Sequence, residues 1–164
     1  MFINVVIGVL AYQDRFLLVK RKKGNFPNLW GLIGGKVEDG EHLDEAIIRE
    51  LKEETEINVQ PRKLLGVTTE MVTDNGKTSS TVLFCWQIEL VNIKNAHVDK
   101  ETSWYSKNEK LELRWFTKDE LSLRNDIVGS DLDFLNNFYF ENKTNYLKVD
   151  CYRGENGIYK WEVI

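Results

Sequence analysis

The sequence predicts a mixed β-sheet flanked by helices, an α/β or α+β fold. Two observations lead to it. About six to eight segments have the apolar or alternating pattern of strands, and two or three have apolar residues at helical spacing. The chain has 164 residues, 42% of them hydrophobic, which suits one core of ordinary size. We therefore expect a single domain over residues 1–164.

The first elements are expected to be a hairpin and a short apolar segment. Turn residues Gln13-Asp14-Arg15 separate the two hairpin strands. A loop over residues 22–29 comes next, and the pair Gly34-Gly35 closes the short segment that follows it. In order, the three strand-like segments are Phe2–Tyr12, Phe16–Arg21 and Trp30–Ile33.

A helix and three strands are expected in the middle of the chain. Start signals from Asp39 to Glu41 precede a helix over Leu43–Glu54. The turn Asp74-Asn75-Gly76 joins two long strands. The strands are Leu64–Val72, Thr78–Val91 and, later, Leu111–Phe116.

The C-terminal part is expected to contain a helix and a β-hairpin. Ser130 is the predicted N-cap of a helix over Ser130–Tyr139, with Asp133 three residues further on. The segments Tyr146–Tyr152 and Ile158–Val163 alternate about the turn Asn156-Gly157 and so predict the hairpin.

Composition argues against several classes of protein. The formal charge is 22 − 26 = −4, so we expect no basic surface for a long nucleic acid. The apolar run Val5–Ala11 is too short to cross a bilayer and lacks the basic start of a signal peptide. Cys85 and Cys151 lie far apart without CxxC spacing, which predicts two reduced thiols in strands or core. We expect a cytoplasmic protein with no membrane partner.

Acidic residues occupy the apolar face of the helix over Leu43–Glu54. At about 100° per residue, Glu50 and Glu54 lie within the apolar stripe and Glu53 lies at its edge. A buried carboxylate without a partner costs several kcal/mol, and Arg49 can compensate only one. Oxygen ligands select a hard divalent ion, Mg²⁺ or Mn²⁺. The simpler alternative is a surface helix with an i,i+4 pair between Arg49 and Glu53. The stripe itself consists of Leu43, Ala46, Ile47 and Leu51.

The segment from Gly35 to Ile57 resembles the Nudix box, G-x5-E-x7-R-E-U-x-E-E-x-G-U, in which U is apolar. Gly35, Glu41 and the run Arg49–Ile57 match it at every position but one. The order of elements around the box is also similar to the MutT/Nudix family. The resemblance implies an α/β/α sandwich with a mixed sheet. It also implies Mg²⁺-dependent hydrolysis of a nucleoside diphosphate linked to another group, X.

The resemblance further implies roles for the residues of the box. Glu53 and Glu54 would bind the metal, and Glu50 would be a further ligand or the base that activates water. Gly35 would contribute its carbonyl oxygen. Arg49 would orient Glu53 or its neighbours.

Two more acidic positions complete the site that the resemblance implies. Glu41 would tie the loop to the helix through Arg49 or the outer shell of the metal. The family often adds a distal carboxylate from a loop before a later strand. Glu109 is the best-placed candidate for it, and Glu112 is the second choice.

Phosphate contacts are assigned to glycines and cations near the box. Gly34 and Gly35 let the backbone approach phosphates, although a turn that needs positive φ explains a glycine pair equally well. Lys36 and Arg21 are the candidate phosphate-binding cations. Arg21 belongs to the basic run Lys20–Lys23, for which a solvated loop is the simpler interpretation.

Glu56 stands where the box has its second glycine. Helices often end at this point in a left-handed residue. A residue other than glycine costs about 1 kcal/mol there, which affects stability and not the metal site. Alternatively, Asn58 takes the left-handed turn.

Evidence on the substrate is weaker. His42 and His97 are expected to be solvated loop residues. Four aromatic residues are candidates for stacking on a base or for the core. The stretch with Asp131, Asp133 and Phe134 resembles the tail of bacterial family members that hydrolyse oxidised purine nucleoside triphosphates. The aromatic candidates are Phe26, Trp30, Trp86 and Trp104.

The sequence therefore predicts a nucleotide pyrophosphohydrolase. The first substrate class is an oxidised dGTP-like triphosphate, cleaved to monophosphate and pyrophosphate. ADP-ribose or a nucleotide sugar is the alternative substrate, and a non-catalytic nucleotide-sensing module is the alternative function. The expected partner is a small nucleotide, and a homodimer stays open.

Overall fold

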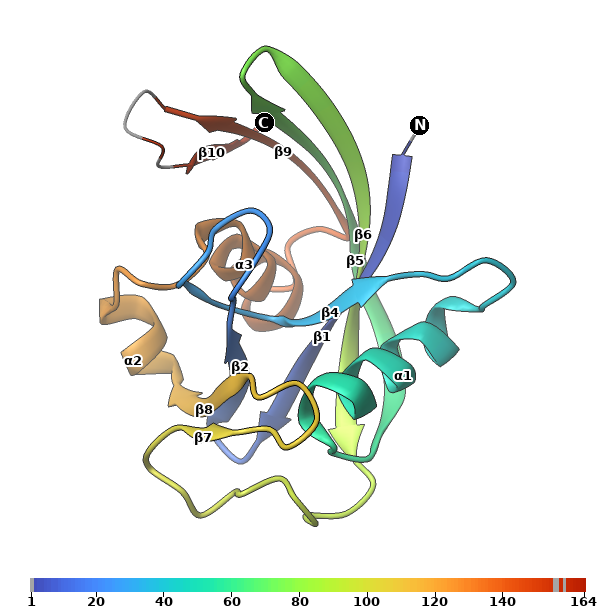
Figure 1. The fold of residues 1–164 in the computed structure, drawn as a ribbon, viewed down its shortest axis with the longest axis vertical. Coiled ribbons are helices and arrows are strands. Elements are labelled where there is room, and N and C mark those ends of the chain that lie inside the picture. Colours follow the sequence, from blue (N-terminus) through green and yellow to red (C-terminus); the bar gives the residue numbers. More distant parts are fainter. Residues whose placement is uncertain (1, 155–156, 158) are drawn as a thin grey trace.

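A computed structural model describes residues 2–154, 157 and 159–164 of the chain (Figure 1). The helical segments are α1 (Leu43–Thr55), α2 (Lys118–Leu123), α3 (Gly129–Phe134) and η1 (Leu135–Phe140), the last of which is a π-helical continuation of α3. The strands are β1 (Phe2–Tyr12), β2 (Arg15–Lys20), β3 (Trp30–Gly31), β4 (Ile33–Lys36), β5 (Val59–Asp74), β6 (Lys77–Leu90), β7 (Trp104–Tyr105), β8 (Glu112–Thr117), β9 (Tyr146–Arg153) and β10 (Tyr159–Val163).

The strands form the mixed sheet that the sequence predicts. Their order is β10-β9-β5-β6-β1-β2-β8-β7, with β3 paired to β2 and β4 paired to β1. β1 runs parallel to β6, and β9 runs parallel to β5, whereas the other pairs are antiparallel. The β5–β6 hairpin turns at Asn75 (φ 50°) and Gly76 (φ 74°), as the Asn-Gly signal predicts.

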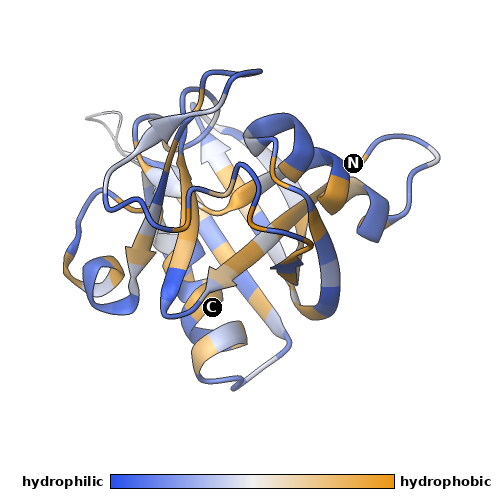
Figure 2. Ribbon diagram, turned by 90° about the horizontal axis from the view of Figure 1, so that it is seen from below, coloured by the Kyte–Doolittle hydropathy of each residue, from blue (hydrophilic) through white to orange (hydrophobic). Residues whose placement is uncertain are grey.

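Helices cover both faces of this sheet. Alternate residues of β1 enter two separate cores, because successive side chains of a strand point to opposite faces. Val6 and Leu10 pack in the core that contains the apolar residues of α1. Ile7 and Val9 pack in the core that contains Phe134 of α3 and the apolar residues of η1. Figures 1 and 2 show the apolar strands between the helices, which confirms the predicted sandwich.

Two predictions about secondary structure were wrong. Gly34 and Gly35 do not close a strand but lie inside β4, paired with Ile7 and Val6. Ser130 is not an N-cap, because α3 begins one residue earlier after Val128 and has no side-chain cap.

The sequence interpretation also missed β3 as a separate strand, β7 and α2. α2 begins with a capping box in which the Thr117 hydroxyl accepts from the Glu120 N–H, and the Glu120 carboxylate accepts from the Thr117 N–H.

The C-terminal hairpin packs against the start of α3. β9 and β10 pair antiparallel, with Trp161 opposite Cys151. The Trp161 ring lies so close to Gly129 that a Cβ there would be 1.5 Å from it, and its Nε1 donates to Asp133 at 3.0 Å. Two positions of the expected turn region, residues 156 and 158, lie outside the described residues. No described helix is long and apolar enough to span a membrane.

Candidate functional site

α1 is placed by its apolar stripe, and this placement turns its carboxylates toward β4. Ala46, Ile47 and Leu51 are fully buried against the sheet. The helix begins after His42, whose backbone N–H donates to the Glu45 carboxylate at 3.0 Å. His42 is thus an exposed N-terminal cap residue, in line with the expected solvated position.

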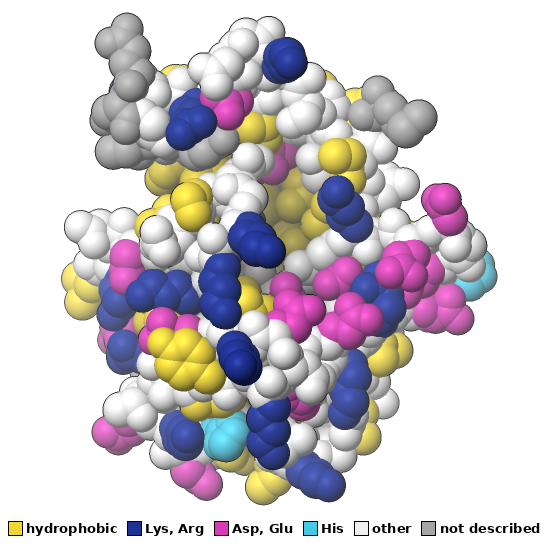
Figure 3. Space-filling model, viewed as in Figure 1, with side chains coloured by type: hydrophobic (Ala, Val, Ile, Leu, Met, Phe, Trp, Pro, Cys, Tyr) yellow, Lys and Arg dark blue, Asp and Glu magenta, His cyan; other side chains and the backbone are white. Residues whose placement is uncertain are grey.

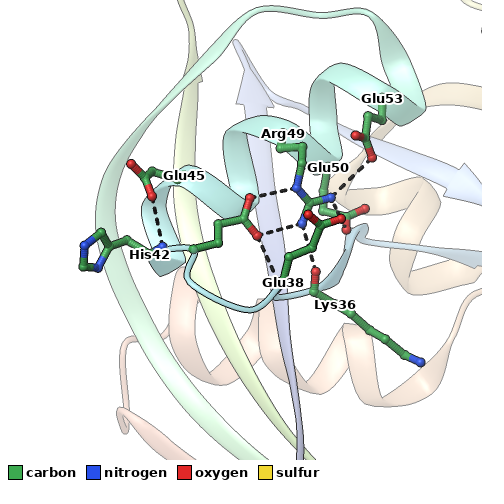
Figure 4. Close-up of polar contacts among 8 residues, drawn as sticks. Lys36, Glu38, His42, Glu45, Arg49, Glu50 and Glu53 are labelled. Atoms are coloured by element: carbon green, nitrogen blue, oxygen red, sulfur yellow. Dashed lines mark hydrogen bonds and ion pairs between the residues drawn. The ribbon is translucent and has the colours of Figure 1, made fainter.

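Arg49 is the centre of an acidic network (Figure 4). Its guanidinium binds both carboxylate oxygens of Glu41 at 2.7 and 2.9 Å and donates to the Lys36 carbonyl at 3.0 Å. It also donates to Glu50 at 2.8 Å and to Glu53 at 3.3 Å. The hydrogen bond from Arg49 lowers the pKa of Glu41 to about 2. Arg49 therefore links Glu41, in the loop before α1, to the α1 carboxylates of Glu50 and Glu53.

Glu50 and Glu53 differ in their surroundings. The Glu53 side chain is 52% exposed, whereas that of Glu50 is 14% exposed. Burial raises the pKa of Glu50 against the effect of Arg49, and the charges of Glu53 and Glu109 add to the increase. Glu50 is therefore a carboxylate held in a crowded negative environment.

The glycine pair is explained by close approach and not by a turn. A Cβ on Gly34 would lie 2.0 Å from the Val6 carbonyl oxygen of the neighbouring strand. A Cβ on Gly35 would lie 2.4 Å from the Glu50 carboxylate. Only glycine lets β4 pass this close to β1 and to α1.

Glu54 has the least compensated carboxylate of the helix. Its Oε2 is buried and has no hydrogen-bond partner among the described residues. Burial is the main cause that raises its pKa to about 8; the charges of Glu50 and Glu109 raise it further, while Arg21 and the Gly34 N–H oppose them. Among the described residues, no cation forms a hydrogen bond with this buried Glu54 oxygen.

Glu109 faces α1 from the loop before β8. It is exposed, lines the same pocket as Glu54, and its charge raises the pKa of both Glu50 and Glu54. Glu112 is engaged elsewhere: it accepts from the Ser103 hydroxyl at 2.7 Å and pairs with Lys20 at 3.6 Å. Between these two candidates, the geometry favours Glu109.

A pocket of about 670 Å³ opens beside these carboxylates. Figure 3 shows a hollow with an apolar floor and with acidic and basic side chains at its rim. Lys36 and Gly34 line it, together with all four residues of the basic run Lys20–Lys23. Part of its wall is apolar and includes Phe26, Leu32 and Val128.

Two further carboxyl groups lie in the wall of this pocket. Asp131 is buried and accepts from the Leu32 N–H at 2.7 Å and from Arg21 at 3.2 Å. Glu70 is buried and accepts from the Cys151 thiol at 3.4 Å. Burial raises the pKa of both carboxyl groups.

Sequence reasoning named Asp131 only as part of a weak resemblance, and it missed Glu70. A signal for Glu70 was available. It alternates with Thr68 and Val72 on the buried face of β5, where a carboxyl group is unexpected.

Most of the remaining candidates lie apart from the pocket. Of the four aromatic residues, only Phe26 lines it; Trp30 packs on Phe116 and Trp104 packs on His97. Trp86 packs against the α1-side core. Cys85 and Cys151 are buried free thiols, as predicted. Asp133 caps the Trp161 indole instead of facing the pocket.

A divalent metal ion fits the donors beside Glu54. In the described part of the chain no three acidic, histidine or cysteine side chains form a complete metal cage. Mg²⁺ is typically held by one or two carboxylates, with waters and substrate phosphates as the other ligands. The unpaired Glu54 oxygen and the nearby Glu50 carboxylate and Gly35 backbone supply such an incomplete set of oxygen donors.

Comparisons with known proteins agree with this architecture. The family model for the NUDIX domain matches residues 3–138. An ADP-ribose pyrophosphatase of Methanocaldococcus jannaschii is 32% identical over 103 residues, which are 63% of this chain and 61% of that protein. An 8-oxo-dGTP diphosphatase of Proteus vulgaris is 30% identical over 97 residues, 57% of this chain and 87% of that protein. The chain thus spans about three fifths of the length of the first of these relatives.

Solved structures show the same fold. A MutT protein from Bacillus halodurans has a TM-score of 0.64 with 22% identity and covers 99% of this chain and 97% of its own. A NUDIX hydrolase from Nitrosomonas europaea has a TM-score of 0.69 with 20% identity. The match covers 85% of this chain and 89% of that chain. The sandwich, the box on α1 and the match over residues 3–138 lead to one conclusion: the chain belongs to the Nudix hydrolase family.

Proposed function

We propose that the protein hydrolyses a nucleoside triphosphate to a monophosphate and pyrophosphate with Mg²⁺. The observation that carries the proposal is the buried, unpartnered Glu54 oxygen, with Glu50 beside it and Glu109 facing it across a pocket lined with cations. Such an arrangement of carboxylates and cations is suited to polyanionic phosphates. Mn²⁺ is an alternative ion.

In this proposal the carboxylates and cations have separate tasks. Glu50, Glu53, Glu54 and the Gly35 carbonyl would hold the metal. When bound, the metal neutralises phosphate charge and lowers the pKa of water. Arg49 keeps Glu50 and Glu53 in place through its hydrogen bonds.

The chemical step needs a base and phosphate contacts. Arg21, Lys36 and the Gly34 backbone line the pocket where they can orient the phosphates. Glu109, which lines the same pocket, would take a proton from the attacking water. The water oxygen bonds to phosphorus as the bridging P–O bond breaks, and the leaving phosphate group takes the electron pair.

The pocket wall supports a purine as the base. Binding sites are typically apolar with a few polar groups that fix orientation. Here Phe26, Leu32 and Val128 form apolar surface, and Asp131 and Glu70 are buried carboxyl groups in the same lining. Carboxyl groups can pair with the N–H groups of a purine edge. We therefore place oxidised dGTP-like nucleotides first.

ADP-ribose is the second candidate. The specific observation in its favour is the 32% identity to a relative named ADP-ribose pyrophosphatase. A cytoplasmic location is part of the proposal, and the two buried free thiols are compatible with it.

A panel of nucleotides with Mg²⁺ tests the proposal. Oxidised dGTP, dGTP, ADP-ribose and nucleotide sugars are incubated with the protein, and monophosphate, pyrophosphate and orthophosphate are measured. We expect pyrophosphate as the first product of a triphosphate, with ¹⁸O from labelled water in one product only. Orthophosphate as the first product would contradict the proposal. Tight nucleotide binding without turnover would instead identify a sensing module.

A further inference from the structure

Glu56, the residue after α1, has a strained backbone. Its φ of 60° and ψ of 9° lie in the left-handed region, which favours glycine. Asn58, the alternative for this turn, does not have a positive φ. The chain therefore places a charged side chain at a position where a glycine would relieve strain.

The Glu56 side chain makes a contact that a glycine cannot make. Its Oε1 accepts a hydrogen bond from the backbone N–H of Asn108 at 2.6 Å. The Glu56 carbonyl accepts weaker contacts from Lys52 at 3.3 Å and Asn95 at 3.4 Å. Of the contacts in this group, only the carboxylate reaches the loop before β8.

The loop over residues 106–111 carries Glu109 and is held on two sides. On the α1 side, Glu56 binds Asn108, the residue next to Glu109. On the other side, the Lys22 ammonium donates to the carbonyls of Glu109 at 3.4 Å and Lys110 at 2.5 Å. The loop is closed at its base by the Ser106 N–H, which donates to the Leu111 carbonyl at 2.9 Å.

We infer that Glu56 is a positioning residue that holds the Glu109 loop against the end of α1. A charged acceptor makes a stronger hydrogen bond than a neutral one, and this bond links the helix with Glu50 and Glu54 directly to the loop with Glu109. The role of Glu109 rests on the proposed function, whereas the link from Glu56 to the loop does not. The hydrogen bond to Asn108 thus offsets the backbone strain at Glu56, and it also fixes the distance between α1 and the Glu109 loop.

Two variants separate this role from a merely structural one. Glu56→Gly removes the contact and relieves the left-handed strain, so we expect a melting temperature equal to or above that of the wild type. We also expect kcat to fall about fivefold while KM stays within about twofold. Glu56→Gln keeps an acceptor at the same place and should recover most of kcat. Asn95→Gly is the matched control, because it removes a contact to the Glu56 carbonyl and keeps the positive φ of residue 95 (63°).

Hydrogen–deuterium exchange of the Asn108 amide tests the link without any activity. We expect faster exchange in Glu56→Gly, and nearly normal exchange in Glu56→Gln and Asn95→Gly. Unchanged exchange in Glu56→Gly would overturn the inference even if the enzyme is active. If the wild type hydrolyses no nucleotide, the exchange result still decides whether Glu56 holds the loop.

A double-mutant cycle with Glu109→Gln tests what the link is for. If Glu56 acts through Glu109, the double variant Glu56→Gly with Glu109→Gln has the kcat of Glu109→Gln within about twofold. If the double variant instead loses kcat by the product of the two single-variant factors, the two residues act independently and the inference is overturned. Full activity of Glu109→Gln would overturn the assigned role of Glu109 and the purpose assigned to the link, while the exchange experiment alone decides whether Glu56 holds the loop. Normal kcat in Glu56→Gly beside an impaired Glu109→Gln would overturn the inference alone.

Discussion

Carboxyl groups border the pocket on two sides, and the protein satisfies them in different ways. On the pocket wall, Asp131 has Arg21 and the Leu32 N–H as partners, and Glu70 has the Cys151 thiol. On the α1 side, Arg49 binds Glu50 and Glu53, but the buried Glu54 oxygen has no partner among the described residues. Both wall carboxyl groups therefore have hydrogen-bond partners, whereas on the α1 side one buried carboxylate oxygen has none among the described residues. Ligand chemistry is therefore expected on the α1 side and ligand selection on the wall.

The largest effect is expected from the α1 side. Glu53→Gln and Glu54→Gln should each lower kcat a hundredfold or more, about 3 kcal/mol, while the fold survives. The reason is that each change removes a proposed metal ligand without a change of shape. Turnover and melting temperature measured together test this. Near-normal turnover in both variants would show that the carboxylates on the α1 side of the pocket do not bind a catalytic metal ion.

The lack of a partner for the buried Glu54 oxygen should also be visible in the stability of the metal-free protein. The pKa of Glu54 is raised from 4.5 to about 8, so its contribution to stability is present below pH 4.5 and lost as pH rises through about 8. Glu54→Gln does not titrate. Between pH 4.5 and pH 8 we therefore expect the stability of Glu54→Gln relative to the wild type to rise by up to about 4 kcal/mol, since each pKa unit corresponds to about 1.4 kcal/mol.

Melting curves in a chelator from pH 4 to pH 9 measure this difference. The buried carboxyl groups of the pocket wall, Asp131 and Glu70, titrate in both proteins and cancel in the comparison. A constant gap between the two curves across this range would show that Glu54 is not the uncompensated group.

Glu109 extends the α1 side to the opposite loop. Glu109→Gln should lower kcat at least tenfold, about 1.4 kcal/mol, with little change in melting temperature because the residue is exposed. Glu112→Gln is the control and should leave kcat within about twofold, since Glu112 binds Ser103 and Lys20. The reverse order would assign the distal role to Glu112, and two silent variants would show that another residue completes the site.

The smallest effect is expected from the wall. Asp131→Asn and Glu70→Gln should raise KM for a purine nucleotide about fivefold, about 1 kcal/mol, with kcat within about twofold. The physical reason is that these groups would contact the base and not the reacting phosphate. Asp133→Asn is the control, because Asp133 binds the Trp161 indole. A large loss of kcat with unchanged KM would place the wall in the chemical step.

The two sides also differ in how far the sequence revealed them. Glu50, Glu53 and Glu54 lie close together on one helix, so helical geometry alone predicts that they share one face. Glu70 and Asp131 are far apart in the chain and come from a strand and a short helix. Their proximity to the same pocket depends on how β5 and α3 pack, which no local pattern encodes.

Local misjudgements have a similar cause. For the glycine pair in β4 the sequence left two explanations open, an approach to phosphates and a turn, because its real constraint, the approach of Val6 and Glu50, comes from other elements. The start of α3 was misplaced because the residue before it, Val128, is fixed by a tertiary hydrogen bond from its N–H to the Trp30 carbonyl and not by a capping side chain.

By itself, the sequence determined the mixed sheet, the long β5–β6 hairpin and the helix with its acidic face, because alternation, the Asn-Gly turn and the apolar stripe are local properties. Only the tertiary structure decided which carboxylate lacks a partner, which loop carboxylate faces it and what the residue at position 56 binds. The physical reason is that hydrogen bonding and desolvation depend on neighbours from distant parts of the chain. Arg49 satisfies two acids of its own helix, whereas Glu54 is left against β4 and the Glu109 loop.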